Sequence, residues 1–506
     1  MPSTQADNSP HRPGLSPVRF TSIAFIAVAA ACFAAADIEI STLDPWTEMG
    51  RLALGIVTPD FGATDRLLEA LLHTIAFAVL GVALGNVLGL LLALLFDFWI
   101  VRTGCAVVRA VHELFWALIF LQILGLTPWT GILAIGIPYA GIIAKVYAEI
   151  IEEADPAPFR LLPKGTGRIS AFLFTRMPDS LAHFRSYSLY RLECGLRSSA
   201  VLGFVGLPTI GFHLESAFSQ GLYSEVSALL LLFYLIIATI RQWLRRALIP
   251  FYIVAAFMVL PEGSAVSWTS AWNFFTYDIL PHPLRVATEI NLDTVSATWT
   301  WFLTLLREQA LPGVVNTLLL TMIALVATGV LTLMAFPLIS PVFFGRFGRG
   351  VGHTLLVIVR STPEYVLAYV FLQLWGPSML PAIVALSLHN GGIIGHLIGR
   401  FTETLQPKLA RARASDRYFY EIVPQVYPQF LAFLFYRWEV ILRETAILGM
   451  LGVQTLGFFV DSAFADIRFD RAVVLIGVTA ILNIGVDAAS RAIRAKLRLR
   501  TTFDSV

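Results

Sequence analysis

Long apolar segments recur along the whole chain, and they restrict its possible folds more than any other feature. A helix needs about 20 apolar residues to cross the hydrocarbon core of a bilayer, and the segments have lengths of that order. They lack the period-2 alternation of a transmembrane β-barrel. We therefore predict an all-α integral membrane protein with about twelve transmembrane helices. The segments lie near residues 20–36, 67–98, 108–126, 129–150, 196–214, 224–242, 248–262, 312–341, 353–374, 378–399, 440–458 and 472–490.

Composition argues in the same direction. Of the 506 residues, 57% are hydrophobic and 14% are charged, whereas soluble domains carry about 25% charged residues. This argues against a soluble enzyme, a disordered chain and a nucleic-acid-binding protein. No Gly-Lys dipeptide occurs, so there is no Walker A loop, and three scattered cysteines exclude a disulfide framework or a thiolate metal cluster. We expect no catalytic site, metal or cofactor in this chain, and no nucleic-acid partner.

Basic residues mark alternate connections between the segments. The connections 151–180 and 402–426 are rich in Arg and Lys, whereas 37–66 and 263–311 are poor in them. Because cytoplasmic loops carry the excess of Arg and Lys, both termini are predicted to lie in the cytoplasm. The first segment, 20–36, also has features of a signal peptide, and we favour an uncleaved first helix.

The two halves of the chain match each other. The motif Tyr-Arg-x-Glu at 190–193 returns at 436–439, 246 residues later (436 − 190). Arg197 returns as Arg443 at the same offset. The equivalent basic connections lie on the same side of the membrane, so the repeat is parallel, and an inverted repeat is excluded. The predicted regions are an N-terminal region with the first helix and an external loop (1–64), a first transmembrane domain (65–248), a linking helix and external loop (249–309), a second transmembrane domain (310–497) and a cytoplasmic tail (498–506).

The two basic connections are long and amphipathic, and each ends in a hydrophobic residue followed by proline, which favours a helix stop before the next span. Anionic lipid head groups could hold such a segment. Alternatively, each contains a short helix that docks a partner, and two equivalent copies would dock two copies of it; we favour docking. The docking candidates are Arg160, Lys164, Gly165, Arg168 and Pro178 in the first half and Lys408, Arg411, Arg413, Arg417 and Pro424 in the second.

Charged residues inside the predicted spans are the other candidates for function, because charge within a membrane is costly. Glu193 and Arg197 lie four residues apart, and their counterparts in the second half have the same spacing, so each pair can meet on one helix face. Each is either a structural ion pair or a place where arginine offers positive charge to an oxyanion. The substrate-pathway candidates are Arg191, Glu193, Arg197, Arg437, Glu439, Arg443 and His389.

Two further Arg–Glu pairs have the same spacing near the cytoplasmic ends of their spans. They are Arg109 with Glu113 and Arg360 with Glu364, and we expect structural ion pairs there. The acids that we identify within spans all have an arginine at helical spacing. This argues against a proton-coupled carrier.

The chain resembles the permease subunit of bacterial phosphonate ABC importers, within the binding-protein-dependent, methionine-importer-like permease superfamily. The resemblance covers roughly 65–248 and 310–497, so two permease units are fused in one chain. The residues that carry it are Arg109 to Ala117, Glu153 to Pro156, Tyr190 to Glu193, Arg197 to Gly203, Gly206 and Ile210-Gly211 in the first half, and Arg360 to Glu364 and Tyr436 to Gly452 in the second.

The resemblance implies the translocation pathway of an ATP-driven importer for phosphonates or related phosphorus oxyanions, in the bacterial inner membrane. It implies two copies of a cytoplasmic ABC ATPase, which bind ATP and Mg, and an external substrate-binding protein on loops near 37–66, 207–224, 263–311 and 453–471. One alternative is the same machine with another cargo, such as phosphate, phosphite, methionine or a quaternary amine. Another is a secondary transporter or a membrane scaffold without an ATPase.

Overall fold

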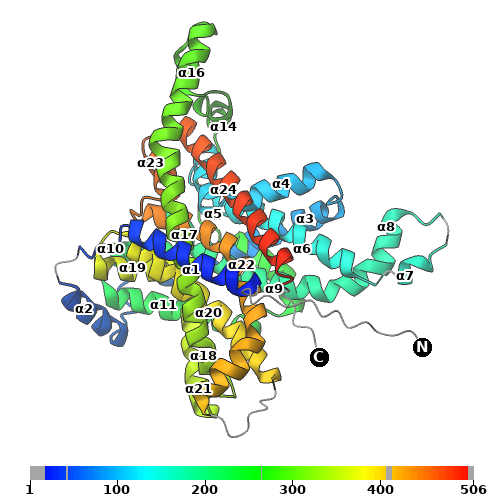
Figure 1. The fold of residues 1–506 in the computed structure, drawn as a ribbon. Helices are drawn as coiled ribbons and strands as arrows, with labels where there is room; N and C mark the ends of the chain where they lie inside the picture. The colour runs from blue at the N-terminus through cyan, green and yellow to red at the C-terminus, as the bar shows by residue number, and fades with distance from the viewer. Residues whose placement is uncertain are drawn as a thin grey trace, which may run out of the picture.

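The computed structural model describes residues 17–41, 44–155, 157–163, 165–263, 265–405 and 413–499, and within these ranges it is helical without a strand (Figure 1). The first half contains α1 (Pro17–Ala35), α2 (Pro45–Val57), α3 (Leu67–Leu94), α4 (Trp99–Ala110), α5 (Glu113–Leu124), α6 (Pro128–Glu153), α7 (Ala157–Arg160), α8 (Arg168–Ala171), α9 (Met177–Val201), α10 (Ile210–Ser219), α11 (Tyr223–Ala238) and α12 (Ile240–Trp243). The remainder contains α13 (Ile249–Val259), α14 (Trp268–Asn273), α15 (His282–Val286), α16 (Leu292–Leu305), α17 (Leu311–Ala335), α18 (Arg346–Ser361), α19 (Glu364–Trp375), α20 (Met379–Phe401), α21 (Ala414–Asp416), α22 (Val423–Met450), α23 (Leu456–Ala465) and α24 (Phe469–Lys496).

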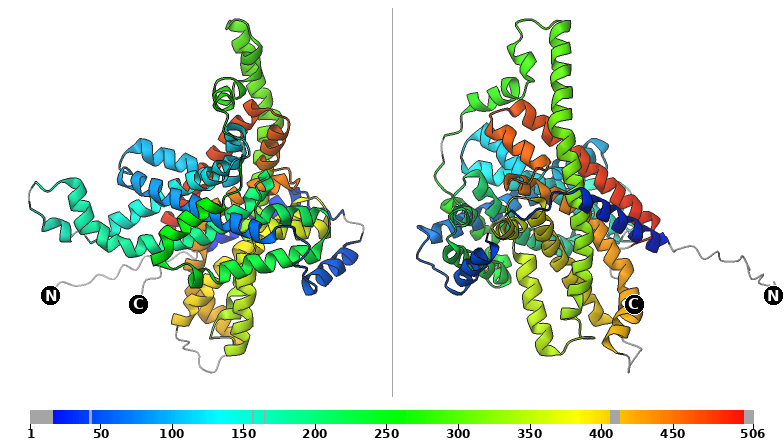
Figure 2. Two further views of the ribbon diagram at one scale, coloured as in Figure 1. Left: turned by 180° about the vertical axis from the view of Figure 1, so that it is seen from behind. Right: turned by 60° about the vertical axis from the view of Figure 1, so that its left-hand side comes forward.

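Six helices of the described chain are long and apolar enough to cross a membrane, or up to nine if each of three bent helix pairs is one span. The predicted count of about twelve is therefore not confirmed. One of the six is a continuous helix over Leu292–Ile339, 48 residues long. At 1.5 Å per residue it measures about 72 Å, more than twice the hydrocarbon thickness of about 30 Å. Figures 1 and 2 show its α16 end projecting beyond the other helices.

Two of the predicted spans, 108–126 and 353–374, each contain a sharp bend, so neither is a single straight helix. α4 and α5 meet at 94°, and α18 and α19 meet at 92°. Thr362 precedes a proline, which disfavours the helical region, and its ψ is 121°. Val111 is also extended, with a ψ of 131°, and the ring of the next residue, His112, accepts a hydrogen bond from the Leu114 N–H at 3.1 Å.

Each half also has a second break, where a short helix folds back on a long one: α10 on α9, and α23 on α22. A Cβ on Gly203 would overlap the backbone of α10, and a Cβ on Gly449 would overlap that of α23. The Thr74 hydroxyl accepts a hydrogen bond from the first N–H of α10 at 2.9 Å. The Thr317 hydroxyl accepts one from the first N–H of α23 at 3.0 Å. The repeated sequence thus produces the same local structure twice.

The helix that precedes each half packs on the opposite half (Figure 2). α1 lies on α17 and α22, where the Phe25 ring contacts Phe435 and Trp438 at centroid distances of 5.0 and 5.4 Å. α13 lies on α3. The chain after α1 also stays with the second half, because the Met379 N–H donates to the Asp37 carbonyl at 2.9 Å. The domain boundaries predicted at 64 and 309 divide the chain by residue number only. In space, α1 packs on the second half and α13 packs on the first half, and we call these two helices the crossed arms.

Candidate functional site

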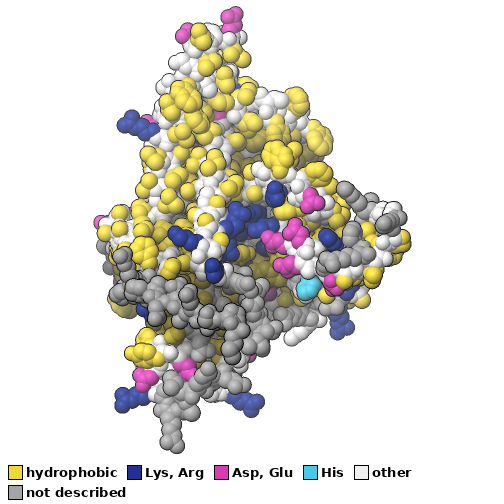
Figure 3. Space-filling model, turned by 45° about the vertical axis from the view of Figure 1, so that its right-hand side comes forward, with side chains coloured by type: hydrophobic (Ala, Val, Ile, Leu, Met, Phe, Trp, Pro, Cys, Tyr) yellow, Lys and Arg dark blue, Asp and Glu magenta, His cyan; other side chains and the backbone are white. Residues whose placement is uncertain are grey.

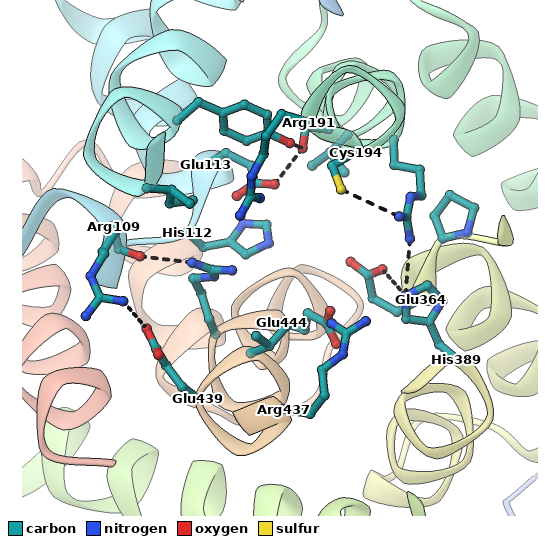
Figure 4. Close-up of a pocket in the computed structure, with 18 of the residues that line it drawn as sticks. Arg109, His112, Glu113, Arg191, Cys194, Glu364, His389, Arg437, Glu439 and Glu444 are labelled. Atoms are coloured by element: carbon teal, nitrogen blue, oxygen red, sulfur yellow. Dashed lines mark hydrogen bonds and ion pairs between the residues drawn. The ribbon is translucent and has the colours of Figure 1, made fainter. Parts of the chain in front are cut away.

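A polar cavity of about 180 Å³ lies where the two halves meet. Its walls come from α4, α5, α6 and α9 on one side and from α19, α20 and α22 on the other, and Figure 4 shows their side chains converging. On the face drawn in Figure 3, Lys and Arg gather beside Asp and Glu in a recess bordered by hydrophobic surface. The charged and imidazole side chains that line the cavity are Arg109, Arg191, Arg197, Arg437, Arg443, Glu113, Glu364, Glu439, Glu444, His112 and His389.

Arg197 and Arg443 do not pair with the glutamates four residues before them. Arg197 instead donates to the Arg360 carbonyl at 3.4 Å, and Arg443 donates to the Arg109 carbonyl at 3.0 Å. Both carbonyls lie in the last turn of a helix that ends at a bend, where four carbonyls have no partner within the helix. A guanidinium is favoured at such a negative helix end. Each arginine therefore caps a broken helix of the opposite half. Of the two alternatives for these residues, the ion pair within one helix is not formed.

Arg109 also binds across the two halves. Its guanidinium contacts Glu439 at 3.2 Å and Asp487 at 2.9 Å. The predicted pairing of Arg109 with Glu113 is wrong because the 94° bend separates them, and Glu113 accepts a hydrogen bond from Ser198 at 2.7 Å. Sequence reasoning missed Asp487, which lies on α24 with no counterpart motif to mark it.

For Arg360 and Glu364, the 92° bend likewise puts the two residues on different helices. Their predicted pairing assumed that both residues lie on one helix, and they do not. Each residue nevertheless has an interaction partner in the structure. Glu364 faces the ring of His389, with 4.0 Å between its Oε2 and Nε2.

Arg191 and Arg437 occupy equivalent positions in the repeated motif but have different surroundings. The Tyr187 hydroxyl accepts hydrogen bonds from Arg191 Nε and Nη2 at 2.8 and 2.6 Å. The rings of Tyr139 and Tyr190 lie 5.6 and 5.5 Å from the same guanidinium. Arg437 makes no hydrogen bond or ion pair with the residues that the structure describes, so its donors are available to a ligand.

Glu364, His389 and Glu444 form a cluster on the side of the cavity that belongs to the second half. One acceptor atom from each lies within 4.8 Å of the others. The His389 ring approaches the Thr362 carbonyl through Nδ1 at 2.8 Å, so Nδ1 carries the proton and Nε2 presents a lone pair. Glu444 accepts a hydrogen bond from Asn390 at 2.9 Å. Sequence reasoning missed Glu444. Two signals could have identified it: it has no arginine three or four residues away, and it aligns with Ser198 at the repeat offset of 246.

Comparison with known proteins places the chain in a family. Residues 333–499 match the model of the binding-protein-dependent transport system inner membrane component. Over 101 residues the chain is 32% identical to the putative cryptic phosphonate transport system permease protein PhnE2 of Escherichia coli (strain K12), covering 20% of this chain and 83% of that protein. The chain belongs to the binding-protein-dependent permeases.

This permease is also similar to two other relatives. The phosphate-import permease protein PhnE of Mycolicibacterium smegmatis is 25% identical over 423 residues, 77% of this chain and 76% of that protein. The phosphite transport system permease protein PtxC of Stutzerimonas stutzeri is 29% identical over 221 residues, 42% of this chain and 80% of that protein. No solved structure matches the chain. Family and membrane helices together make it an inner-membrane protein.

The predicted site residues of this permease fall into two places. Of the pathway candidates, all but Glu193 line the cavity. The described docking candidates lie outside it, in the segments around α7, α8 and α21, which Figure 1 shows at two separate extremities. Gly165 sits in a turn with a φ of +100°, which favours glycine. Pro178 and Pro424 lie in the first turns of α9 and α22, Arg160 and Arg168 lie in α7 and α8, Arg413 precedes α21, and Arg417 follows it. Lys164, Lys408 and Arg411 lie outside the described residues.

Proposed function

We propose that this permease forms the translocation pathway of an ATP-driven importer for phosphonates or related phosphorus oxyanions. The relatives support this cargo class, since they carry names that refer to phosphonate, phosphite and phosphate transport. The observation that carries the proposal is the cavity between the halves, with five arginines, of which Arg437 has donors free for a ligand. A guanidinium fork suits the oxygens of a phosphoryl group.

In this proposal the chain comprises two parallel permease units of about six spans each, with both termini in the cytoplasm. Two ABC ATPase subunits, which bind ATP and Mg, dock on the segments around α7, α8 and α21 and hydrolyse ATP. An external binding protein delivers the anion to the loops of the opposite side. Alternating access is a rocking of the halves. The hydrogen bonds that Arg197 and Arg443 donate to the opposite half support this. Each one joins an arginine of one half to the bend of the other, so a movement of one half would also move that bend.

The test is the ATPase activity of the chain reconstituted in liposomes with its ATPase and binding protein. We expect stimulation by ethylphosphonate, and none by sulfate at the same concentration. Stimulation by inorganic phosphate or phosphite alone would keep the importer and replace the cargo, in agreement with two of the relatives' names. Uptake by the chain without any ATPase would contradict the proposal and favour a secondary transporter.

A further inference from the structure

A group of basic side chains lies where the first turns of α18 meet the last turns of α20. The rings of His353 on α18 and His396 on α20 have their centroids 5.1 Å apart, and the two helices pack side by side (Figure 1). Arg349 lies four residues before His353, and Arg400 lies four residues after His396, so each arginine shares a helix face with its histidine. We call these four residues the basic cluster. None of them lines the polar cavity between the halves.

The basic cluster has little negative charge around it. The chain from Ala335 to Ser361 contains no Asp or Glu. The first acid after α20 is Glu403, which is exposed and forms no ion pair with Arg400. The side chains that act electrostatically on His396 are all basic, namely Arg360, His353 and Arg400. Positive charge is therefore concentrated at this end of the two helices.

The first half has an ion pair at the place that corresponds to this positive charge. At an offset of 251, which also relates the bends of the two halves, His396 corresponds to Lys145 and Arg400 to Glu149 (396 − 145 and 400 − 149). Lys145 and Glu149 pair with each other at 3.8 Å. The second half thus has a base at the first position and an arginine in place of the acid. This difference indicates that an anion from outside the chain balances the second half.

Two nitrogen atoms of the basic cluster are buried without a partner. His396 is 5% exposed, and its Nε2 makes no hydrogen bond with any described residue. Arg349 Nε is likewise shielded from solvent, and it has no hydrogen-bond partner in the described chain. Buried polar groups normally have a partner, and the Nε of arginine can only donate. The missing partner is therefore an acceptor, and the surrounding positive charge favours a negatively charged one.

A second face of α18 locates the basic cluster relative to the bilayer. Large apolar side chains at spacings of three and four residues share this face. They are Phe347, Val351, Leu355 and Ile358, and their exposed fractions are 87, 57, 50 and 46%. A helix with one apolar and one basic face lies at the membrane surface, with its apolar face in contact with lipid tails. The basic connection 402–426 follows α20, so this end is predicted to be cytoplasmic, the side on which basic pockets between helices bind anionic head groups.

We propose that the basic cluster binds a phosphate group between α18 and α20, and that this phosphate belongs to an anionic phospholipid of the cytoplasmic leaflet. The phosphate oxygens accept hydrogen bonds from the two histidines and from Arg400, while the acyl chains remain in the bilayer that contacts α18. The site belongs to the second half alone, because the Lys145–Glu149 pair is already balanced. Since the cluster lies outside the cavity, the inference does not depend on the proposed cargo. A free phosphate offers the same oxygens, and the experiment separates the two sources.

The test measures lipid binding to the full-length chain, purified in detergent, by native mass spectrometry. Phosphatidylglycerol and phosphatidylcholine with the same acyl chains are titrated separately, because only the first carries a net negative charge. We expect one phosphatidylglycerol to bind with a dissociation constant at least about tenfold lower than that of phosphatidylcholine. Inorganic phosphate in millimolar excess should not displace it, since a soluble anion lacks the acyl chains that hold the lipid in place.

Three variants assign this binding to the cluster. Arg400→Glu, which installs the acid of the first half, should raise the dissociation constant of phosphatidylglycerol at least about tenfold. Arg400→Lys keeps the charge and should raise it much less, whereas His353→Ala should weaken binding in the same direction as Arg400→Glu. The matched control is Arg102→Glu, which makes the same change of charge on α4 at the position equivalent to His353 and should keep the wild-type affinity. All three positions are exposed, and thermal denaturation checks that each variant is folded.

Four outcomes contradict the inference. Equal wild-type affinities for the two lipids would remove the preference for an anionic head group. An unchanged affinity in both Arg400→Glu and His353→Ala would place the lipid elsewhere on the protein. An equal loss in Arg102→Glu and Arg400→Glu would show that overall charge, rather than the basic cluster, attracts the lipid. Displacement of phosphatidylglycerol by inorganic phosphate would replace the lipid with a soluble phosphate as the occupant.

Discussion

At the scale of single residues, Arg191 and Arg437 show how one motif can serve two purposes. Both follow a tyrosine and precede a glutamate by two positions. Arg191 is enclosed by Tyr139, Tyr187 and Tyr190, whereas Arg437 has donors that no described residue uses. Tyr187 and Tyr190 lie on α9 with Arg191, and Tyr139 lies on α6. The four-residue motif does not include Tyr139 or Tyr187, so it could place the arginines in a pathway but could not distinguish their roles.

We expect Arg437→Ala to lower oxyanion uptake at least about tenfold, because it removes charge-assisted hydrogen bonds to the ligand, without a change in thermal stability. Arg191→Ala should instead lower the free energy of unfolding by about 1–2 kcal/mol, through its lost cation–π contacts. Radiolabelled uptake in liposomes and thermal denaturation of the purified variants measure the two effects. Equal loss of stability in both variants would show that the two arginines are equivalent.

At the scale of helices, sequence periodicity identified where apolar segments lie but not where they bend. The predicted spans near 67–98 and 378–399 correspond to α3 and α20. The bends within 108–126 and 353–374 were not predicted, because a bend depends on one or two extended residues within an otherwise apolar run. The Thr362-Pro363 pair was the one local signal, and the first half has no proline at that place. The ion pair predicted between Arg109 and Glu113 from helical spacing failed for the same reason.

The close crossing of α9 and α10 gives a prediction for Gly203. We expect Gly203→Ala to cost about 1–3 kcal/mol or more, because the new Cβ overlaps backbone atoms that cannot move aside as a side chain would. Gly477→Ala on α24, where no atom lies within 4 Å of the added Cβ, is the control and should be neutral or slightly stabilising. Thermal unfolding in detergent compares them, and equal midpoints would refute the overlap.

At the scale of the whole molecule, contacts between the halves concentrate around the two bends. Arg109 of the first half joins Glu439 and Asp487 of the second, with side-chain exposures of 14%, 14% and 8%. The internal repeat predicted that two similar halves exist, and the family match supports a permease. The repeat could not predict these pairs between the halves, because pairing across an interface has no fixed sequence spacing.

Removing Arg109 should therefore be costly. We expect Arg109→Met to lower the free energy of unfolding by about 3–5 kcal/mol, because two buried carboxylates lose their shared partner. Adding Glu439→Gln should recover part of this loss, while Asp487 retains Arg491 at 3.3 Å. Chemical denaturation of the single and double variants gives the coupling energy. Strict additivity of the two changes would mean that the pair does not hold the halves together.

The crossed arms impose an order on synthesis. α1 ends at Ala35, but α17, on which it packs, begins only at Leu311, 276 residues later (311 − 35). Ribosomes add about 5–20 residues per second, so α17 follows after about 14–55 s. During that interval the nascent chain holds its first helix in the membrane before the surface that receives it exists. A ribosome that stalls before Leu311 therefore leaves α1 in the membrane without the helix on which it packs.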